Sequence, residues 1–538
     1  MIVQWLSWLR HLLSGEGPAV RENVGMRAEA VVMSDRTMQG IPELRGYFRT
    51  NKVPIYFISP TAFNLLGIDR WVRNFRYVNY FDSLEGHHPR VFVPERVPHE
   101  QFTSIEDVCN YLLAHAQMRP YILNRAGGDT GLGAGTAALA PGSAGAGSAG
   151  RAVFVFFDEE SERLADELGL KVALPAAELR RRLDSKIVTT QLGNEAGVPS
   201  VPNVLGRADS YPALMKLAAD HGLGDDLVVQ TPYGDSGKTT FYIKSEADWK
   251  AHAEAIEGEE LKVMRRINPR AIAVEACITR CGTVVGPVMT ELIGHPQLTP
   301  YRGGWCGNEI YFGALSERNR AQALEFTKRL GDRIAQEGYH GLLEIDYLLD
   351  SDSGELYLGE LNPRLSGISS MTNVSAGAYA DMPLFLFHLA EYLDLEYQVD
   401  VDEINARWGS EAHTDVWAQI IIKETSDRVE LLTEAPASGT WRLGREGGME
   451  LVRSDVDWHA LQEEDEGFYL RILGPGDYRY EGADLGILVV RQRLQSDEGE
   501  ITEQCKRWIE AIRDRFSGVP VEPSDPGPTF DALAVKSN

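Results

Sequence analysis

Short apolar segments alternate with helix-like segments over the first part of this 538-residue chain. From Val53 the apolar runs have the length and the Val, Ile and Phe content of β-strands, and a helix-like run at 162–168 follows the third of them. Strands that alternate with helices predict an open α/β domain, which we expect to end near Ser185. The expected strands are 53–58, 91–93 and 153–157.

The pattern changes twice further along the chain. Between 186 and about 395, long helix-like runs alternate with strands, which predicts an α+β core with a smaller sub-lobe. After about 410 the apolar runs are short and separated by turn sequences, which predicts a mostly β domain closed by a helix at about 500–516. The expected helices are 186–197, 211–221, 245–257 and 317–337, and the later strands are 417–423, 439–443, 469–473 and 486–490.

These patterns predict an α/β and α+β multidomain protein. We expect an N-terminal extension at 1–45, an α/β domain at 46–185, a central domain at 186–395, a β-rich domain at 396–518 and a tail at 519–538. Residues 127–150, inside the first domain, are nearly all Gly, Ala, Ser and Thr. Such a segment has too little apolar surface to order itself, so we expect a flexible insertion.

Two apolar runs joined by an Asp/Ser/Gly turn occupy residues 341–364, and they carry acids where a buried hairpin should have none. Alternate side chains of a strand share a face, so Glu360, Asn362 and Arg364 point the same way. Asp346 on the partner strand stands across from them. Carboxylate and amide oxygens are ligands that Mg²⁺ prefers, and an arginine adds a fixed cation for phosphate or carboxylate. A surface hairpin is the alternative, but the apolar flanks favour a buried metal site.

A glycine-containing loop joins two further predicted strands, 227–230 and 241–244. Its small residues let backbone N–H groups approach phosphate oxygens, and Lys238 adds a point charge. The run Gly-Lys-Thr is not a P-loop, because Pro232 replaces the first glycine of that motif and a strand rather than a helix follows. We expect a flap over a nucleotide, with an ordinary hairpin turn as the alternative.

A second cation stands at the start of the helix expected from 186. The sequence Asp-Ser-Lys at 184–186 offers N-cap chemistry, and the positive end of a helix suits an anion. Lys186 is therefore a candidate phosphate ligand. The alternative is a solvated lysine in a first helical turn, and the sequence at this point does not decide between the two.

The net charge of −26 excludes one large class of partners. A strongly acidic chain repels phosphate backbones, so we expect no nucleic acid to bind, and a nucleotide must be held by local cations and N–H groups. The five cysteines form no CxxC pair, which argues against zinc and for free thiols in a reducing compartment. Because no long apolar span is found, we expect a cytoplasmic protein without a membrane segment.

Taken in order, Lys186, the strand–flap–strand unit at 227–244, the segment 262–267 and the motifs Gly-x4-[Asp/Glu]-[Phe/Tyr] and Glu-x-Asn-x-Arg resemble the ATP-grasp family. The resemblance covers about 160–395, and the flanking domains are similar to those of its biotin-carboxylase-like branch. It implies a pre-ATP-grasp α/β domain, an ATP-grasp fold with a flap sub-lobe and a C-terminal β domain, with ATP and Mg²⁺ or Mn²⁺ as cofactors. The implied residues are Asp346, Glu360 and Asn362 for the metal, with Glu344 as a further candidate acid, Arg364 and Lys238 for catalysis, and Lys186, Gln230, Gly234, Ser236, Gly237, Lys238, Arg265 and Ile267 for the nucleotide.

Three positions depart from that family. Gln230 stands where a phosphate lysine is usual on the strand before the flap, so Lys238 is a candidate replacement. Ile368 stands where biotin carboxylases have a glutamate suited to deprotonating bicarbonate, and no arginine occurs within 419–423, where they have one. The resemblance therefore favours a carboxylate–amine ligase over biotin-carboxylase-type bicarbonate activation. A nucleotide-binding regulator without turnover is the alternative from another class, and Gln230 is its only support.

The segment 299–309 combines a cation, an aromatic ring and glycines beside the presumed site. We expect a substrate loop in which Arg302, Trp305 and Asn308 contact the substrate, with a glycine-rich connector as the alternative. The ligase reading implies that ATP phosphorylates a carboxylate, that Mg²⁺ and Arg364 hold the acyl phosphate, and that an amine attacks it. The expected partners are a small-molecule carboxylate and an amine, and a homodimer is left open.

Overall fold

The computed structural model describes residues 37–96, 102–126, 150–234, 239–445 and 447–521. The chain divides into two compact units, 1–37 and 38–538, and every helix and strand given below belongs to the second unit. The predicted insertion therefore lies outside the described residues, except that Gly150 opens a strand. The flap residues 235–238 also lie outside them.

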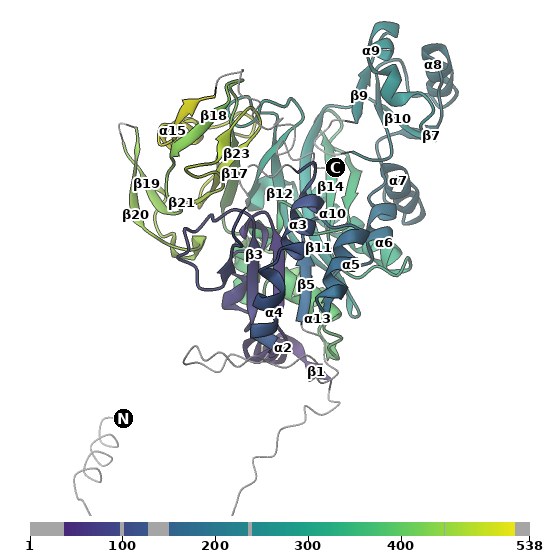
Figure 1. Ribbon diagram of the computed structural model, residues 1–538. Helices are drawn as coiled ribbons and strands as arrows, with labels where there is room; N and C mark the ends of the chain where they lie inside the picture. The colour runs from purple at the N-terminus through teal and green to yellow at the C-terminus, as the bar shows by residue number, and fades with distance from the viewer. Residues whose placement is uncertain (1–36, 97–101, 127–149, 235–238, 446, 522–538) are drawn as a thin grey trace, which may run out of the picture. The chain divides into compact units, whose positions relative to one another are not determined.

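A five-stranded parallel sheet forms the N-terminal layer of this unit (Figure 1). The spatial order is β4 (Val91–Phe92), β3 (Phe75–Asn79), β2 (Ile55–Ser59), β5 (Gly150–Phe154) and β6 (Leu170–Val172). Two of its three inner strands, β2 and β3, are buried along their whole length, as expected for a parallel sheet covered on both faces. The associated helices are α2 (Gly40–Thr50), α3 (Ile105–Ala114), α4 (Met118–Ala126) and α5 (Glu159–Glu167).

The folded part begins before the expected boundary at residue 46. The two-residue strand β1 (Met38–Gln39) pairs with β16 (Tyr397–Gln398). Leu44 and Phe48 lie one turn apart on α2, and both side chains are fully buried. Their i, i+4 spacing places both on one face of the helix, and Ile41 and Tyr47 are partly buried against the same core, so the segment from Met38 packs onto the fold and is not an extension.

A four-stranded antiparallel sheet forms the sub-lobe at the upper right of Figure 1. Two helices, α8 (Tyr211–Asp220) and α9 (Glu246–Ile256), bury one apolar face each against it. The register sets Lys262 opposite Gln230, a pairing that matters for the site. The strand order is β7 (Asn203–Gly206), β10 (Leu261–Arg265), β8 (Leu227–Gln230) and β9 (Thr240–Ile243).

A ten-stranded sheet runs through the rest of the unit and crosses the expected domain boundary at 395–396. It is continuous there because β13 (Trp305–Ile310) pairs with β17 (Trp417–Lys423). The remaining strands, in spatial order around that pair, are β15 (Leu356–Asn362), β14 (Gly341–Asp350), β11 (Pro269–Thr279) and β12 (Gly282–Ile293) on one side, and β23 (Asp484–Val490), β21 (Glu466–Arg471), β19 (Gly439–Leu443) and β20 (Met449–Arg453) on the other.

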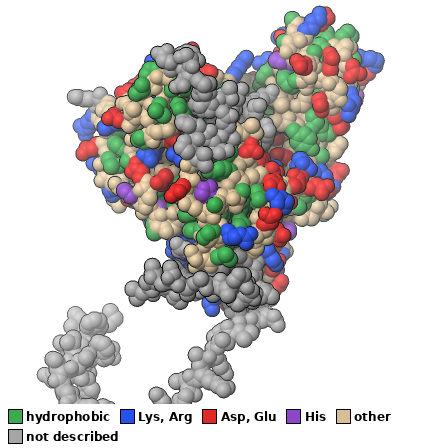
Figure 2. All heavy atoms as spheres, in the orientation of Figure 1, with side chains coloured by type: hydrophobic (Ala, Val, Ile, Leu, Met, Phe, Trp, Pro, Cys, Tyr) green, Lys and Arg blue, Asp and Glu red, His purple; other side chains and the backbone are tan. Residues whose placement is uncertain are grey.

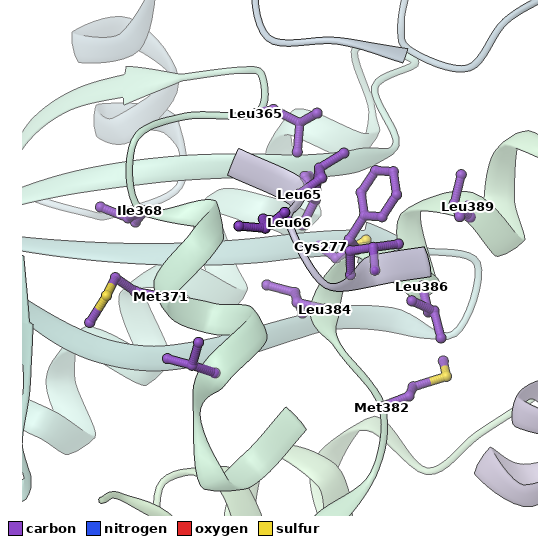
Figure 3. Close-up of a cluster of buried hydrophobic side chains, with 14 of the residues drawn as sticks. Leu65, Leu66, Cys277, Leu365, Ile368, Met371, Met382, Leu384, Leu386 and Leu389 are labelled. Carbon is purple, nitrogen blue, oxygen red and sulfur yellow. The ribbon is translucent and has the colours of Figure 1, made fainter. Parts of the chain in front are cut away.

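Helices on both faces cover the central strands of this sheet. The long helix α10 (Glu317–Ala335) packs on β11 and β12, and α13 (Leu384–Tyr392) packs on β11 and β14. Figure 3 shows the buried cluster beside α13, in which Leu384 and Met382 belong to the same core as Leu65 of the N-terminal layer. The other helices are α6 (Ala177–Leu183), α7 (Lys186–Glu195), α11 (Ser369–Val374), α12 (Ala376–Ala380), α14 (Val401–Trp408) and α15 (Glu503–Arg513), with 3₁₀ turns at Phe63–Leu65, Ile68–Arg70, Phe312–Ala314, Glu411–His413 and Trp458–Ala460.

The C-terminal end corrects one boundary. A three-stranded sheet joins β22 (Tyr478–Arg479), β18 (Glu430–Glu434) and β24 (Ser517–Pro520). Val519 pairs with Leu431, so the fold extends to Pro520 and includes the first residues assigned to the tail. The sequence Ser-Gly-Val-Pro of β24 gave no strand pattern, because β24 is an edge strand with one paired side and only Gly518 is partly buried.

The predicted fold class, a mixed α/β and α+β multidomain protein, is confirmed by this architecture. Acidic and basic side chains are interspersed over the described surface in the orientation of Figure 2. Within the described residues, no helix has the length and apolar character needed to cross a membrane.

Candidate active site

Three carboxylates meet on one face of the ten-stranded sheet. Glu344 and Asp346 lie on β14 and Glu291 lies on β12, and one oxygen from each lies within 4.8 Å of the others. Glu344 is buried, whereas the other two are partly open to a cavity of about 1370 Å³. Three converging acids in one cavity are a candidate site for a divalent cation.

The sheet brings the three acids together across β11, which separates β12 from β14. Ala273 on β11 is the register partner of Asp346, and directly opposed residues share a face. Ala271, two positions earlier, lies on the same face. Two alanines between the acidic strands leave room for the carboxylates to approach one another over β11.

The negative charges of these three acids repel one another. Burial and then the charge of Glu344 raise the pKa of Glu291 to about 8. Burial, followed by the charges of Glu344 and Glu291, raises the pKa of Asp346 well above its ordinary value. Oδ1 of Asp346 is buried and has no hydrogen-bond partner among the described residues. A divalent cation fits these observations, because it would neutralise the cluster and give this oxygen a partner.

A hydrogen-bond chain leads from the acids to an arginine. Nδ2 of Asn362 donates to Oδ2 of Asp346 at 2.9 Å, and Nη2 of Arg364 donates to Oδ1 of Asn362 at 2.8 Å. The Arg364 guanidinium carbon also lies 4.2 Å from the centre of the Phe156 ring. The strand alternation predicted this row of side chains on β15, and β14 sets Asp346 directly opposite Glu360. For Asn362 to offer its oxygen to a cation, its amide must turn over.

Two buried lysines lie at the other end of this row. Nζ of Lys186 lies 3.2 Å from Oε2 of Glu360 and donates to the Gly234 carbonyl at 2.6 Å. The Lys186 backbone N–H donates to the Pro232 carbonyl at 2.9 Å, so the first turn of α7 holds the flap. Ser185 makes no side-chain cap, which corrects the expectation of N-cap chemistry at this helix.

The second lysine is Lys262, whose side chain sequence reasoning did not single out. Its residue is 1 % exposed, it lines the cavity, and its Nζ donates to the Gly359 carbonyl at 3.3 Å. Burial lowers the pKa of Lys262 to about 8, against the attraction of Glu360. Gln230, its register partner, donates from Nε2 to Oγ1 of Thr240 at 3.1 Å.

The remaining predicted residues divide into three groups. Arg265, Ile267, Arg302 and Trp305 line the same cavity as the acids. Ser236, Gly237 and Lys238 lie outside the described residues. Asn308 is fully buried and accepts a hydrogen bond at 2.8 Å from the Trp305 indole N–H, so it supports Trp305 and does not line the cavity. The expected contact between Asn308 and substrate is corrected accordingly.

Glu291 is the acid that sequence reasoning missed. It is the only charged residue of the strand segment Gly282–Ile293, and such a lone acid in an apolar strand carries the same signal as Asp346. Lys262 gives a similar signal, a lysine between Leu261 and Val263. Neither residue belongs to the hairpin motif, so only the sheet pairing connects them to it.

Solved structures with ATP and ADP share this architecture. A biotin carboxylase from Campylobacter jejuni, described as a β-γ-ATP complex, matches with a TM-score of 0.52 at 14% identity, over 87% of this chain and 92% of that one. The biotin carboxylase domain of the Hydrogenobacter thermophilus 2-oxoglutarate carboxylase, described as a complex with MgADP and bicarbonate, matches with a TM-score of 0.51 at 12% identity, over 87% and 91%. This chain has the ATP-grasp fold.

Two curated proteins are similar in sequence to parts of this ATP-grasp chain. The mitochondrial methylcrotonoyl-CoA carboxylase subunit alpha of Arabidopsis thaliana is 23% identical over 230 residues, which is 41% of this chain and 30% of that protein. The [butirosin acyl-carrier protein]–L-glutamate ligase of Niallia circulans is 23% identical over 223 residues, 40% and 48%. The matches span less than half of either relative. No family model matches the chain.

The structure shows the surroundings of the two positions at which this ATP-grasp chain differs from biotin carboxylases. Ile368 is 1 % exposed and belongs to the same buried apolar cluster as Leu65, Met371 and Leu384, shown in Figure 3. β17 presents no arginine, and its Lys423 is paired with Asp484 on β23. Neither position offers a base or an unpaired cation to the cavity.

Proposed function

We propose that this chain is an ATP- and Mg²⁺-dependent ligase that activates a carboxylate as an acyl phosphate and joins it to an amine. The observation that supports it most is the continuous row from the acid cluster through Asn362 to Arg364, with two lysines at its other end. Acids for a metal, cations for phosphates and a separate arginine for an acyl group are the parts that phosphoryl transfer to a carboxylate requires.

Each side chain has a role that its place allows. Glu291, Glu344, Asp346 and Glu360 offer the oxygens that would hold Mg²⁺, which supplies charge neutralisation at the transferring phosphoryl group. Lys186 and Lys262 orient the phosphates from the flap side. Arg364 orients the reacting carboxylate and stabilises the negative charge that develops on it. The backbone near Arg265 and Ile267 lines the part of the cavity assigned to adenine.

The carboxylase alternative lacks support from the site. Deprotonating bicarbonate needs a base beside Arg364, and Ile368 lies in an apolar cluster instead. A non-catalytic regulator is also disfavoured, because regulation alone requires neither the acid cluster nor the buried arginine. Bicarbonate with free biotin should leave ATP hydrolysis unstimulated, whereas a carboxylate with an amine should stimulate it.

The decisive experiment is ADP release from MgATP across a panel of carboxylate and amine pairs. The wild type should form an amide with one ADP and one phosphate per bond. Arg364→Ala should lower kcat/KM by about 100-fold or more, with a much smaller change in ATP affinity measured by calorimetry. Asp346→Asn and Glu360→Gln should each abolish Mg²⁺-dependent turnover with an unchanged circular dichroism spectrum. Carboxybiotin formation would overturn the proposal, and tight ATP binding without any turnover would favour the regulator.

A further inference from the structure

One face of β17 enters the cavity directly beyond Arg364. Gln419, Ile421 and Lys423 alternate along this face. The Gln419 amide donates to the Gly367 carbonyl at 2.7 Å and accepts from the Ser370 hydroxyl at 2.6 Å. Residues 367–370 follow Arg364 closely in the chain, so this strand face is held against the acyl end of the site. Ile421 and Lys423 both line the cavity.

The neighbouring strands continue this surface with apolar side chains. Ile487 on β23 is the register partner of Ile421 and lines the same cavity, as do Ile472 and Leu473 just after β21. Trp305 lines it from β13, and its ring packs so tightly on Gly367 that a Cβ there would lie 2.3 Å from it. We call these five side chains, Ile421, Ile472, Leu473, Ile487 and Trp305, the apolar wall.

Two charged residues beside the apolar wall neutralise each other. Lys423 forms an ion pair with Asp484, its partner in the β17–β23 register. Both side chains are mostly buried, 18% and 28% exposed, so the pair adds little net charge to this end of the cavity. A charged group of the substrate that lies against these isoleucines and this leucine would be desolvated there without a partner, which is costly, and Arg302 is the cation that lines the cavity nearest in sequence to Trp305.

We propose that the carboxylate substrate is an acid with an apolar side chain, which lies on the apolar wall while its carboxylate meets Arg364. This inference rests on the proposed ligase function and specifies the class of acid. Branched aliphatic and aromatic acids fit this wall, and dicarboxylic or amino-terminated acids of the same length do not. Apolar pockets discriminate by about 10- to 200-fold per methylene group, so the preference is measurable.

The test uses hydroxylamine as the amine, so that the natural amine need not be known. The carboxylate oxygen attacks the γ-phosphorus of ATP and ADP leaves. The nitrogen of hydroxylamine then attacks the acyl carbon, and phosphate leaves and takes up the proton that the nitrogen loses, which gives a hydroxamate and hydrogen phosphate. The probes are two pairs of similar length, 4-methylpentanoate against glutarate and 3-phenylpropanoate against 6-aminohexanoate. We expect kcat/KM to be about tenfold or more higher for the apolar member of each pair.

Variants of the apolar wall test whether it causes the preference for apolar acids. Ile421→Arg should lower kcat/KM for 4-methylpentanoate about tenfold or more and leave the calorimetric Kd of MgATP unchanged. The matched control is Leu451→Arg, an exposed leucine on β20 of the same sheet that does not line the cavity, and it should behave as the wild type. If Ile421→Arg fails to fold, Ile421→Ala should shift the preference toward 3-phenylpropanoate by enlarging the wall.

The outcomes separate this inference from the proposed function. Equal or better use of glutarate or 6-aminohexanoate, or an Ile421 variant with unchanged acid preference, would overturn the inference and leave the ligase in place. If the wild type binds MgATP but converts none of these acids, nor any pair of the wider carboxylate and amine panel, the proposed function fails and the inference fails with it.

Discussion

At the scale of single residues, the site contains charged side chains that are buried, and a buried charge without a partner is costly. Lys262 is buried on β10 with one carbonyl as hydrogen-bond partner among the described residues, and Gln230 lies directly opposite on β8. Position 230 on β8 thus has no cation of its own, but the neighbouring strand β10 places Lys262 beside it. We expect Lys262 to serve the phosphate group that position 230 would serve in relatives with a lysine there.

Exchanging the two side chains tests this role. Lys262→Gln should weaken ATP binding by roughly 10- to 100-fold, because a charge-assisted hydrogen bond is lost, while adenosine binding should be unchanged. Adding Gln230→Lys to that variant should restore much of the ATP affinity, since the register places the new amine beside the old one. Both affinities are measured by calorimetry.

The matched control for the exchange is Lys244→Gln. Lys244 follows β9 in the same sub-lobe, is 72% exposed, and is paired with Asp226 on the surface. Its loss should leave ATP affinity unchanged. An ATP Kd in Lys262→Gln equal to that of Lys244→Gln would contradict the assigned role of Lys262.

At the scale of elements, one histidine of α13, His388, makes hydrogen bonds to two layers of the fold. Nδ1 of His388 accepts from the Leu342 N–H of β14 at 3.0 Å, and its Nε2–H donates to the Ala173 carbonyl at 2.8 Å, just after β6. The ring is fully buried, and burial lowers the pKa of His388 to about 3. The folded protein therefore holds a neutral imidazole, because a second proton would remove the acceptor that Leu342 uses.

His388 should make the stability of the fold pH-dependent. In the unfolded chain a histidine takes up a proton below about pH 6.5, whereas the folded ring stays neutral, so acid favours unfolding. This contribution is complete above that pH and falls as the pH drops toward 3. The raised pKa values of Glu291 and Asp346 act in the opposite direction, so the test is a difference between proteins. From pH 7.5 to 5.5 the melting temperature of His388→Gln, which starts lower, should rise relative to that of the wild type. The control is His221→Gln at an exposed position, which should keep the wild-type slope. An unchanged slope in His388→Gln would contradict this account.

At the scale of the whole molecule, one sheet of ten strands ties the ATP-grasp core to the C-terminal layer. The site uses this continuity, because the acids lie on β12 and β14 while the apolar wall lies largely on β17, β23 and the segment after β21. A rigid sheet fixes the distance between the phosphoryl and acyl ends of the cavity. Insertions are therefore expected only outside these strands.

The segment 127–149 tests that expectation. It lies between α4 and β5, and its composition offers almost no apolar surface to bury. Replacing residues 128–148 by a short Gly-Ser linker should change the melting temperature by no more than about 2 °C and leave turnover near the wild-type value. Deleting α2, which buries Leu44 and Phe48, is the contrasting control and should cost far more. A loss of several degrees in the linker variant would show that the segment packs.

The sequence by itself determined the features that depend on local periodicity. Period-two alternation placed Glu360, Asn362 and Arg364 on one face, and a turn between apolar runs placed Asp346 across from Glu360, as the register has it. The order of motifs also indicated the ATP-grasp fold. These inferences hold because a strand's side-chain direction follows from the backbone and needs no distant contact.

Only the tertiary structure decided which strands became neighbours. Glu291 reaches the acid cluster because β11, with two alanines, lies between β12 and β14, and Lys262 comes to lie opposite Gln230 because β10 pairs antiparallel with β8. Asn308 accepts a hydrogen bond from Trp305 and does not line the cavity, and the same sheet continues through an expected domain boundary. Pairing between strands far apart in the sequence is set by how all the apolar faces are buried together, so no single segment encodes it.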